Sequence, residues 1–177
     1  SPANGKPIIV PTQDIVLGLY YLTIDRKHRK GEGKIFADSE EVRVAYDSGE
    51  IDLHAMIKVR MDGERIDTTA GRVILRDVIE DALMELEEEK RKAIMKDMFG
   101  LINRIMDKKT IAQVVDKCYR DAGEKSTVVL SDRLKDLGFY YATLGGISIS
   151  IDDMKIPVKK KKLIEQAEAA VKNVHDQ

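Results

Sequence analysis

Cysteine and histidine are scarce in this chain, and their positions argue against several kinds of site. The single cysteine, Cys118, offers neither an intramolecular disulfide nor a cysteine-based metal cluster, so the composition fits a reducing cytoplasm. The three histidines, His28, His54 and His175, are scattered and lack the spacing of metal ligands. We therefore expect this chain alone to hold no metal and no other cofactor.

Long apolar runs and an excess of one charge are also missing. No run approaches the roughly 20 apolar residues that span a bilayer, and no signal-peptide pattern is present, so we expect a cytoplasmic protein without a membrane partner. The 30 basic and 31 acidic residues leave a net charge of −1, so a nucleic-acid surface would have to be a local basic patch. The chain begins at Ser1 rather than methionine, which suggests an excised domain.

Charged and apolar residues are present in proportions typical of a globular protein. They make up 34% and 43% of the 177 positions, which suits one domain with long solvated helices, or two small lobes. The apolar spacing switches between helical and strand-like periods along the chain. We predict an α+β fold that is mainly helical, with short antiparallel strands.

The first half is predicted to begin with an extended, proline-containing arm and a helix from Thr12 or Gln13. Gly18 lies inside the helical pattern, which favours close packing against another backbone. The later elements of this half are a charged loop over 25–33, a helix over 39–46 capped by Asp38 or Ser39, a half-buried strand over 54–61, a turn over 61–64, and a second strand or extended segment over 68–75.

The second half is predicted to be mostly helical. The pattern is helical from Arg76 to Met106 and again from Lys108 to Gly123. Ser126-Thr127 is the predicted cap of a third helix, which Gly145-Gly146 ends, and the alternating segment 147–151 is predicted to be a strand.

A final helix carries an apolar stripe that lacks a partner in the sequence. Its members fall at a and d spacing: Ile164, Ala167, Val171 and Val174. Two heptads are too short to be stable alone. The stripe must therefore pack on a partner helix, on the body of the domain, or on a crystal neighbour.

No catalytic constellation is evident. Asp152-Asp153 resembles a paired-carboxylate site, but adjacent acids before a helix are more often caps and dipole partners. The segment 31–33 lacks the context and third glycine of a dinucleotide loop. Lys159 to Lys162 suits either a phosphate or acidic partner, or a solvated first helical turn.

Three segments, in order, resemble the largest subunit of multisubunit RNA polymerases, called β′ in bacteria. They are Ser1–Ile24, which contains Ser-Pro-Ala-Asn-Gly-Lys-Pro; Asp67–Arg72, which reads Asp-Thr-Thr-Ala-Gly-Arg; and Ile147–Pro157. The chain departs from the family between Arg76 and Met106, where the usual pattern is a short proline-containing segment. The role of this inserted helical segment is open.

The resemblance implies a piece of a DNA-directed RNA polymerase, a nucleotidyltransferase. Residues 1–157 would form the pore domain, the wall of the secondary channel for nucleotide entry and RNA 3′-end extrusion, and 158–177 would begin a helical hairpin at the channel rim. The catalytic aspartate loop that holds Mg²⁺ would lie upstream of Ser1, and Zn²⁺ elsewhere in β′, so this piece would not be catalytic alone. Its partners would be the rest of β′, the β and ω subunits, cleavage factors, nucleoside triphosphates and RNA.

The resemblance also implies roles for particular residues. Those lining the channel would be Gln13, Asp14, Thr68, Thr69 and Arg72, with Arg72 as an exposed cation.

A further implication is contact with the alarmone guanosine tetraphosphate near Lys125 and Asp132. Asp136 stands where the family has a tyrosine, which weakens the second of these.

Two alternatives remain open from the sequence alone. Gln13 suits an ordinary exposed first-turn residue as well as a channel position. The sequence favours the polymerase segment, and the alternative is a self-contained α+β interaction domain that binds a partner through its last helix.

Overall fold

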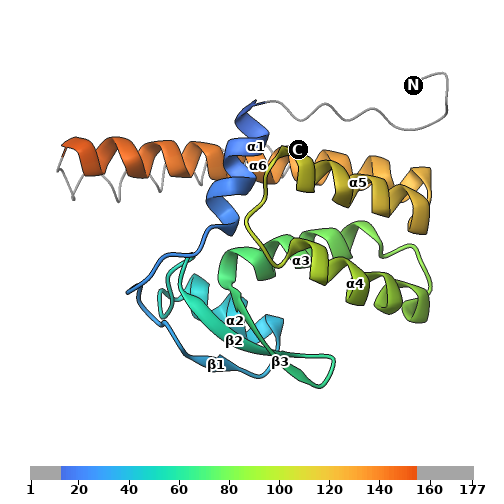
Figure 1. Ribbon diagram of the computed structural model, residues 1–177, viewed down its shortest axis with the longest axis horizontal. Coiled ribbons are helices and arrows are strands. Elements are labelled where there is room, and N and C mark those ends of the chain that lie inside the picture. The colour runs from blue at the N-terminus through green and yellow to red at the C-terminus, as the bar shows by residue number, and fades with distance from the viewer. Residues whose placement is uncertain (1–12, 155–177) are drawn as a thin grey trace.

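The computed structural model describes residues 13–154 (Figure 1). Within that range the fold is α+β and mainly helical, as the sequence predicts. The N-terminal arm and the predicted helix over 158–177 lie outside the described residues, as does the boundary predicted at residue 157. The elements are α1 (Gln13–Thr23), β1 (Ile35–Phe36), α2 (Ser39–Asp47), β2 (Met56–Met61), β3 (Glu64–Thr69), α3 (Ala70–Ala82), α4 (Glu88–Ile102), α5 (Lys108–Ala122) and α6 (Glu124–Met154).

The helices are arranged as two stacked antiparallel pairs joined to a small sheet (Figure 1). α5 and α6 form one pair, and α3 and α4 form the other, with α4 against α5. α2 and the sheet lie beyond α3, and α1 crosses α6 and leads from it towards the sheet. Within residues 13–154, no helix combines the length and apolar character that crossing a bilayer requires.

The sheet has the strand order β1-β2-β3. β2 and β3 pair antiparallel, with Ile57 opposite Thr68, and the predicted alternation is confirmed because Ile57 and Val59 are both buried. Asp62 and Gly63 have positive φ angles of 51° and 81°, which a tight two-residue hairpin turn requires. β1 pairs parallel with β2, a connection that the sequence pattern does not predict.

Apolar side chains form two adjacent clusters that share Tyr46 and Met61 at their borders. The smaller cluster fills the space between the sheet, α2 and the start of α3: Phe36, Val42, Ala45, Ile51, Ile57, Val59, Ala70 and Val73. The larger one joins α1 to the four helices α3 to α6. Asp38 caps α2 and Asp107 caps α5, each accepting a backbone hydrogen bond of 2.8 Å, so the helix starts predicted at 39 and 108 are confirmed.

The crossing of α1 and α6 depends on glycine. A Cβ atom at Gly18 would overlap the carbonyl oxygen of Gly138, and one at Gly138 would press on Ile15. Gly145, further along α6, lies against the ring of Tyr21. The predicted close approach of Gly18 to another backbone is therefore confirmed.

α6 corrects three predictions. It begins at Glu124 directly after Gly123, so Ser126 and Thr127 lie inside its first turns, and the Thr127 hydroxyl donates to the Gly123 carbonyl at 2.8 Å. The helix continues through Gly145-Gly146, because a mid-helix glycine costs only about 1 kcal/mol and Gly145 gains contact with Tyr21. Residues 147–151 are helical and not a strand. The three strands of the described sheet pair only with one another, and an alternating segment without a strand to pair with need not form a strand.

Two further predictions need correction in the middle of the chain. Only Thr68 and Thr69 of the predicted extended segment 68–75 are in a strand, since α3 begins at Ala70. The helical segment from Arg76 to Met106 is broken by a turn over 83–87. That turn lets the apolar face of α4, which includes Met98 and Ile102, fold back on α3 and α5.

We predict opposite effects for two helical glycines. Gly18→Ala should lower the free energy of unfolding by about 3 kcal/mol, because the added methyl overlaps the backbone of α6. Gly100→Ala is the matched control: a Cβ there meets nothing within 4 Å, so it should raise stability by about 0.5–1 kcal/mol. Urea denaturation followed by circular dichroism measures both. Equal effects at the two positions would contradict the tight crossing.

Candidate functional site

The predicted residues Thr68, Thr69 and Arg72 lie at the start of α3. Thr69 is the N-cap of this helix, and its hydroxyl accepts a hydrogen bond from the Arg72 backbone N–H at 3.2 Å. Thr68 is the next-to-last residue of β3, and its buried hydroxyl has no hydrogen-bond partner among the described residues. All three side chains are buried, so they form a structural junction in this chain and not an exposed loop.

The Arg72 side chain closes the C-terminal end of α1. Its Nε donates to the Thr23 carbonyl at 2.9 Å, and its Nη2 donates to Asp25 Oδ1 at 3.1 Å. The last carbonyls of a helix lack partners within the helix and carry its negative dipole end, so a guanidinium suits this position. Burial lowers the pKa of Arg72 and Asp25 opposes that shift; an arginine remains protonated in either case.

The expectation that Arg72 exposes a cation therefore needs correction. Its side chain is only 7% exposed. The sequence pattern predicts an extended segment around Arg72, whereas the structure places it in the first turn of α3, with the end of α1 against it. The contact requires Gly71, where a Cβ atom would overlap the carbonyl oxygen of Leu22.

His54 holds the same turn of α1 from a second direction. Its Nε2 lies 2.6 Å from the Tyr21 carbonyl oxygen and its ring meets the Tyr21 ring edge-on at 4.7 Å. The carbonyl can only accept, so Nε2 carries the proton. The pKa of His54 is lowered, mainly by burial and also by Arg26 and Arg29, although the Tyr21 carbonyl and Asp52 act to raise it. Nδ1 is 3.9 Å from Asp52, too far for a hydrogen bond, so His54 is neutral near pH 7.

Thr23 links the same turn to a third segment. Its hydroxyl donates to the Leu19 carbonyl at 2.7 Å and accepts the backbone N–H of Met106 at 2.8 Å. Sequence reasoning missed both Thr23 and His54, because neither belongs to a recognisable motif. One available signal for His54 is its place between the apolar Leu53 and Ala55, at the start of a predicted strand.

Gln13 and Asp14 lie at the opposite end of α1, where both are exposed in its first turn. Ten residues separate Gln13 from Thr23, which corresponds to about 15 Å along a helix. The structure therefore does not bring them together with Thr68, Thr69 and Arg72. It joins the two groups through one rigid helix.

Lys125 and Asp132 are exposed on α6, seven residues or about 10 Å apart. The Lys125 ammonium lies 3.1 Å from Glu85 Oε2. Both partners are largely exposed, and such pairs contribute only about 0–1 kcal/mol. A phosphate group would therefore meet little resistance in displacing Glu85.

The described residues do not suggest a metal centre. Between residues 13 and 154, no group of three His, Cys, Asp or Glu side chains is arranged to hold a metal ion. Asp152 and Asp153 lie inside α6, in the last turn of that helix that the structure describes. Gly31 and Gly33 have φ angles of 86° and 85°, in a turn that precedes a strand and not a helix.

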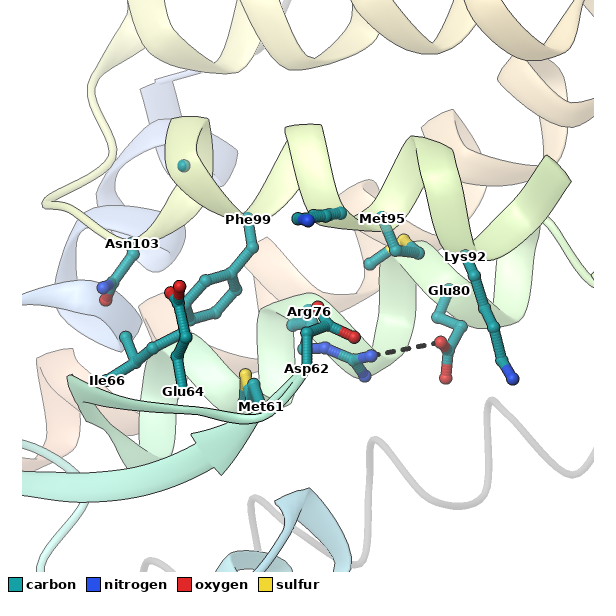
Figure 2. A pocket seen from close by; sticks show the side chains of 12 residues that line it. Met61, Asp62, Glu64, Ile66, Arg76, Glu80, Lys92, Met95, Phe99 and Asn103 are labelled. Carbon is teal, nitrogen blue, oxygen red and sulfur yellow. Dashed lines mark hydrogen bonds and ion pairs between the residues drawn. The ribbon is translucent and has the colours of Figure 1, made fainter. Parts of the chain in front are cut away.

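A cavity of about 390 Å³ separates the β2–β3 hairpin from α4 (Figure 2). Met95 and Phe99 line it together with charged side chains of both signs. Arg76 pairs with Glu80 at 3.2 Å inside it. The balanced charges favour no particular ligand, and none of the predicted site residues lines this cavity.

The pH dependence of stability tests the role of His54. Because burial puts its folded pKa below the ordinary 6.5, its stabilising effect is complete above pH 6.5 and is lost as the pH falls below that value. We expect the free energy of unfolding to decrease between pH 7 and pH 5, and His54→Gln, which keeps a donor for Tyr21, to flatten that decrease. His28→Asn, at an exposed histidine with a φ of 63°, is the control and should keep the wild-type slope. An unchanged slope in His54→Gln would exclude the role.

Comparison with known proteins identifies the family. Residues 1–154 match the family described as RNA polymerase Rpb1, domain 3. The DNA-directed RNA polymerase subunit beta' of Syntrophobacter fumaroxidans is 49% identical over all 177 residues, and the chain spans 12% of that relative's length. The resemblance seen in the sequence motifs is thereby confirmed, and the chain belongs to the RNA polymerase Rpb1 domain 3 family.

Proposed function

We propose that this chain is the pore-domain segment of a bacterial β′ subunit and forms part of the wall of the secondary channel. The observation that carries the proposal is the 49% identity over the whole chain to a segment of a β′ subunit. In the assembled enzyme, which is cytoplasmic and performs DNA-directed RNA synthesis, this segment guides nucleoside triphosphates inward and the RNA 3′ end outward.

In this proposal the chain itself does not catalyse the formation of the RNA phosphodiester bond. Phosphoryl transfer depends on positioned metal ions that neutralise developing charge. The described residues do not fit such a metal, since none of their acidic side chains form a three-ligand group. As the family resemblance implies, we place the Mg²⁺ ions of catalysis, and any Zn²⁺, in other parts of β′.

Gln13 and Asp14 are the residues that we propose to face the channel. Both are exposed, and their helix is anchored at its far end by Arg72, His54 and Thr23. A rigid helix holds its first turn at a fixed position, which is what guidance of a substrate requires.

Arg72 and the two threonines take a different role from the one expected of exposed channel residues. Their burial makes them positioning residues, which act on the channel by fixing α1 against α3. Only a change in the packing of the assembled enzyme would let them touch nucleotides.

The partners proposed for this segment are the remainder of β′, the β and ω subunits, and cleavage factors that enter the channel. Contact of the alarmone with Lys125 is compatible with the exposure of this lysine and with the weakness of its ion pair with Glu85. Asp132 is exposed as well, but Asp136 replaces the tyrosine that the family uses nearby. A self-contained interaction domain is the less favoured function, since family membership accounts for the chain without it.

Substitution of Gln13 tests the channel role. In a complete polymerase that carries this segment, Gln13→Ala should raise the apparent Michaelis constant for nucleotides about 3- to 10-fold, which corresponds to one lost hydrogen bond. Gln113→Ala, at an exposed glutamine of α5, is the matched control and should leave it unchanged. Single-nucleotide addition on a defined scaffold gives the constant, and gel filtration verifies assembly. Wild-type nucleotide addition and RNA cleavage in Gln13→Ala would remove this residue from the channel.

A further inference from the structure

We propose that the loop of residues 26–34, here called the basic loop, binds the phosphate backbone of a nucleic-acid duplex without reading its sequence. The inference does not depend on the proposed channel role. The basic loop holds five cations, Arg26, Lys27, Arg29, Lys30 and Lys34, and a single acid, Glu32. This concentration of positive charge stands out in a chain whose net charge is −1.

The cations of the basic loop are available to a ligand. Lys27, Arg29, Lys30 and Lys34 are exposed, and within residues 13–154 none of the five cations forms an ion pair. Asp25, the acid that directly precedes the basic loop, is already bonded to Arg72. Lysines elsewhere, such as Lys58 and Lys117, have carboxylate partners at 2.9 and 2.7 Å.

The backbone of the basic loop is already ordered by the rest of the fold. Arg26 N–H donates to the His54 carbonyl, Asp52 N–H to the Lys30 carbonyl, and Gly33 N–H to the Met56 carbonyl, each at 2.9 Å. Figure 1 shows this segment between α1 and β1 at the edge of the molecule, on the side away from α4. A loop fixed in advance loses little conformational entropy on binding, so its charges contribute more of their attraction to affinity.

The composition of the basic loop favours a duplex over other polyanionic partners. Residues 26–34 include no apolar side chain, and their one aromatic ring is the imidazole of His28. Protein interfaces depend on buried aromatic and apolar anchors, and single strands are held by stacking on aromatic rings. Arginine and lysine side chains alone suit regularly spaced phosphates, whose contacts carry no sequence information.

The test measures binding of the 177-residue chain to a fluorescent 20-base-pair duplex by anisotropy at 50 and 200 mM salt. The variant combines Lys27→Gln, Arg29→Gln and Lys30→Gln. The control combines Lys96→Gln, Lys108→Gln and Lys109→Gln, which removes the same charge from exposed lysines without ion pairs in the described chain. A third variant replaces each of the four lysines at positions 159–162 with Gln, because that run also carries positive charge. Thermal melts establish that every variant folds.

Loss of three phosphate contacts should reduce the slope of log Kd against log salt by about 2.7. Between 50 and 200 mM salt, the affinity of the wild type should therefore fall about 40-fold more than that of the basic-loop variant. We also expect at least a tenfold weaker Kd for that variant at 50 mM salt, with the control near wild type. Equal affinity of basic-loop and control variants would overturn the proposal, as would loss of binding only in the 159–162 variant. Displacement of the duplex by poly-glutamate at equal charge would overturn it in favour of an acidic protein partner.

Discussion

The last turn of α1 is the point on which the arrangement of the other elements depends. Arg72 from α3, His54 from the segment before β2, and Met106 from the segment before α5 all bond to residues 21–23. Each hydrogen bond contributes about 1 kcal/mol net, but an unpartnered buried group costs about 1–3 kcal/mol. Loss of one of these contacts therefore costs more than the hydrogen bond itself, because its former partner stays buried without a hydrogen bond.

Close packing makes these polar contacts possible. Gly71 brings α3 against the Leu22 carbonyl, and Gly18 brings α1 against Gly138 of α6. The basic loop begins three residues after α1 ends at Thr23. Its first backbone hydrogen bond runs from the Arg26 N–H to the His54 carbonyl. One junction thus orients both of the surfaces proposed to be functional: the exposed first turn of α1 and the basic loop.

Local signals in the sequence predict a large part of the fold. Asp38 and the alternation around Ile57 and Val59 indicate their elements correctly, because caps and period-two burial act within a few residues. Gly145 is mispredicted as a helix end because it instead makes room for Tyr21, more than a hundred residues earlier, and no local pattern records that contact. The motif around Arg72 identifies the family, but its burial depends on where α1 ends, which no local pattern records.

The most direct test of the central role of Arg72 is the free energy of unfolding of Arg72→Met, measured against Arg65→Met by urea denaturation. Arg65 is exposed and forms no ion pair within the described chain, so its substitution should change stability by less than about 0.5 kcal/mol. Arg72→Met should lower stability by about 2–3 kcal/mol, because it leaves the end of α1 without its donor. Equal small changes in the two variants would contradict the view that this contact holds the structure together.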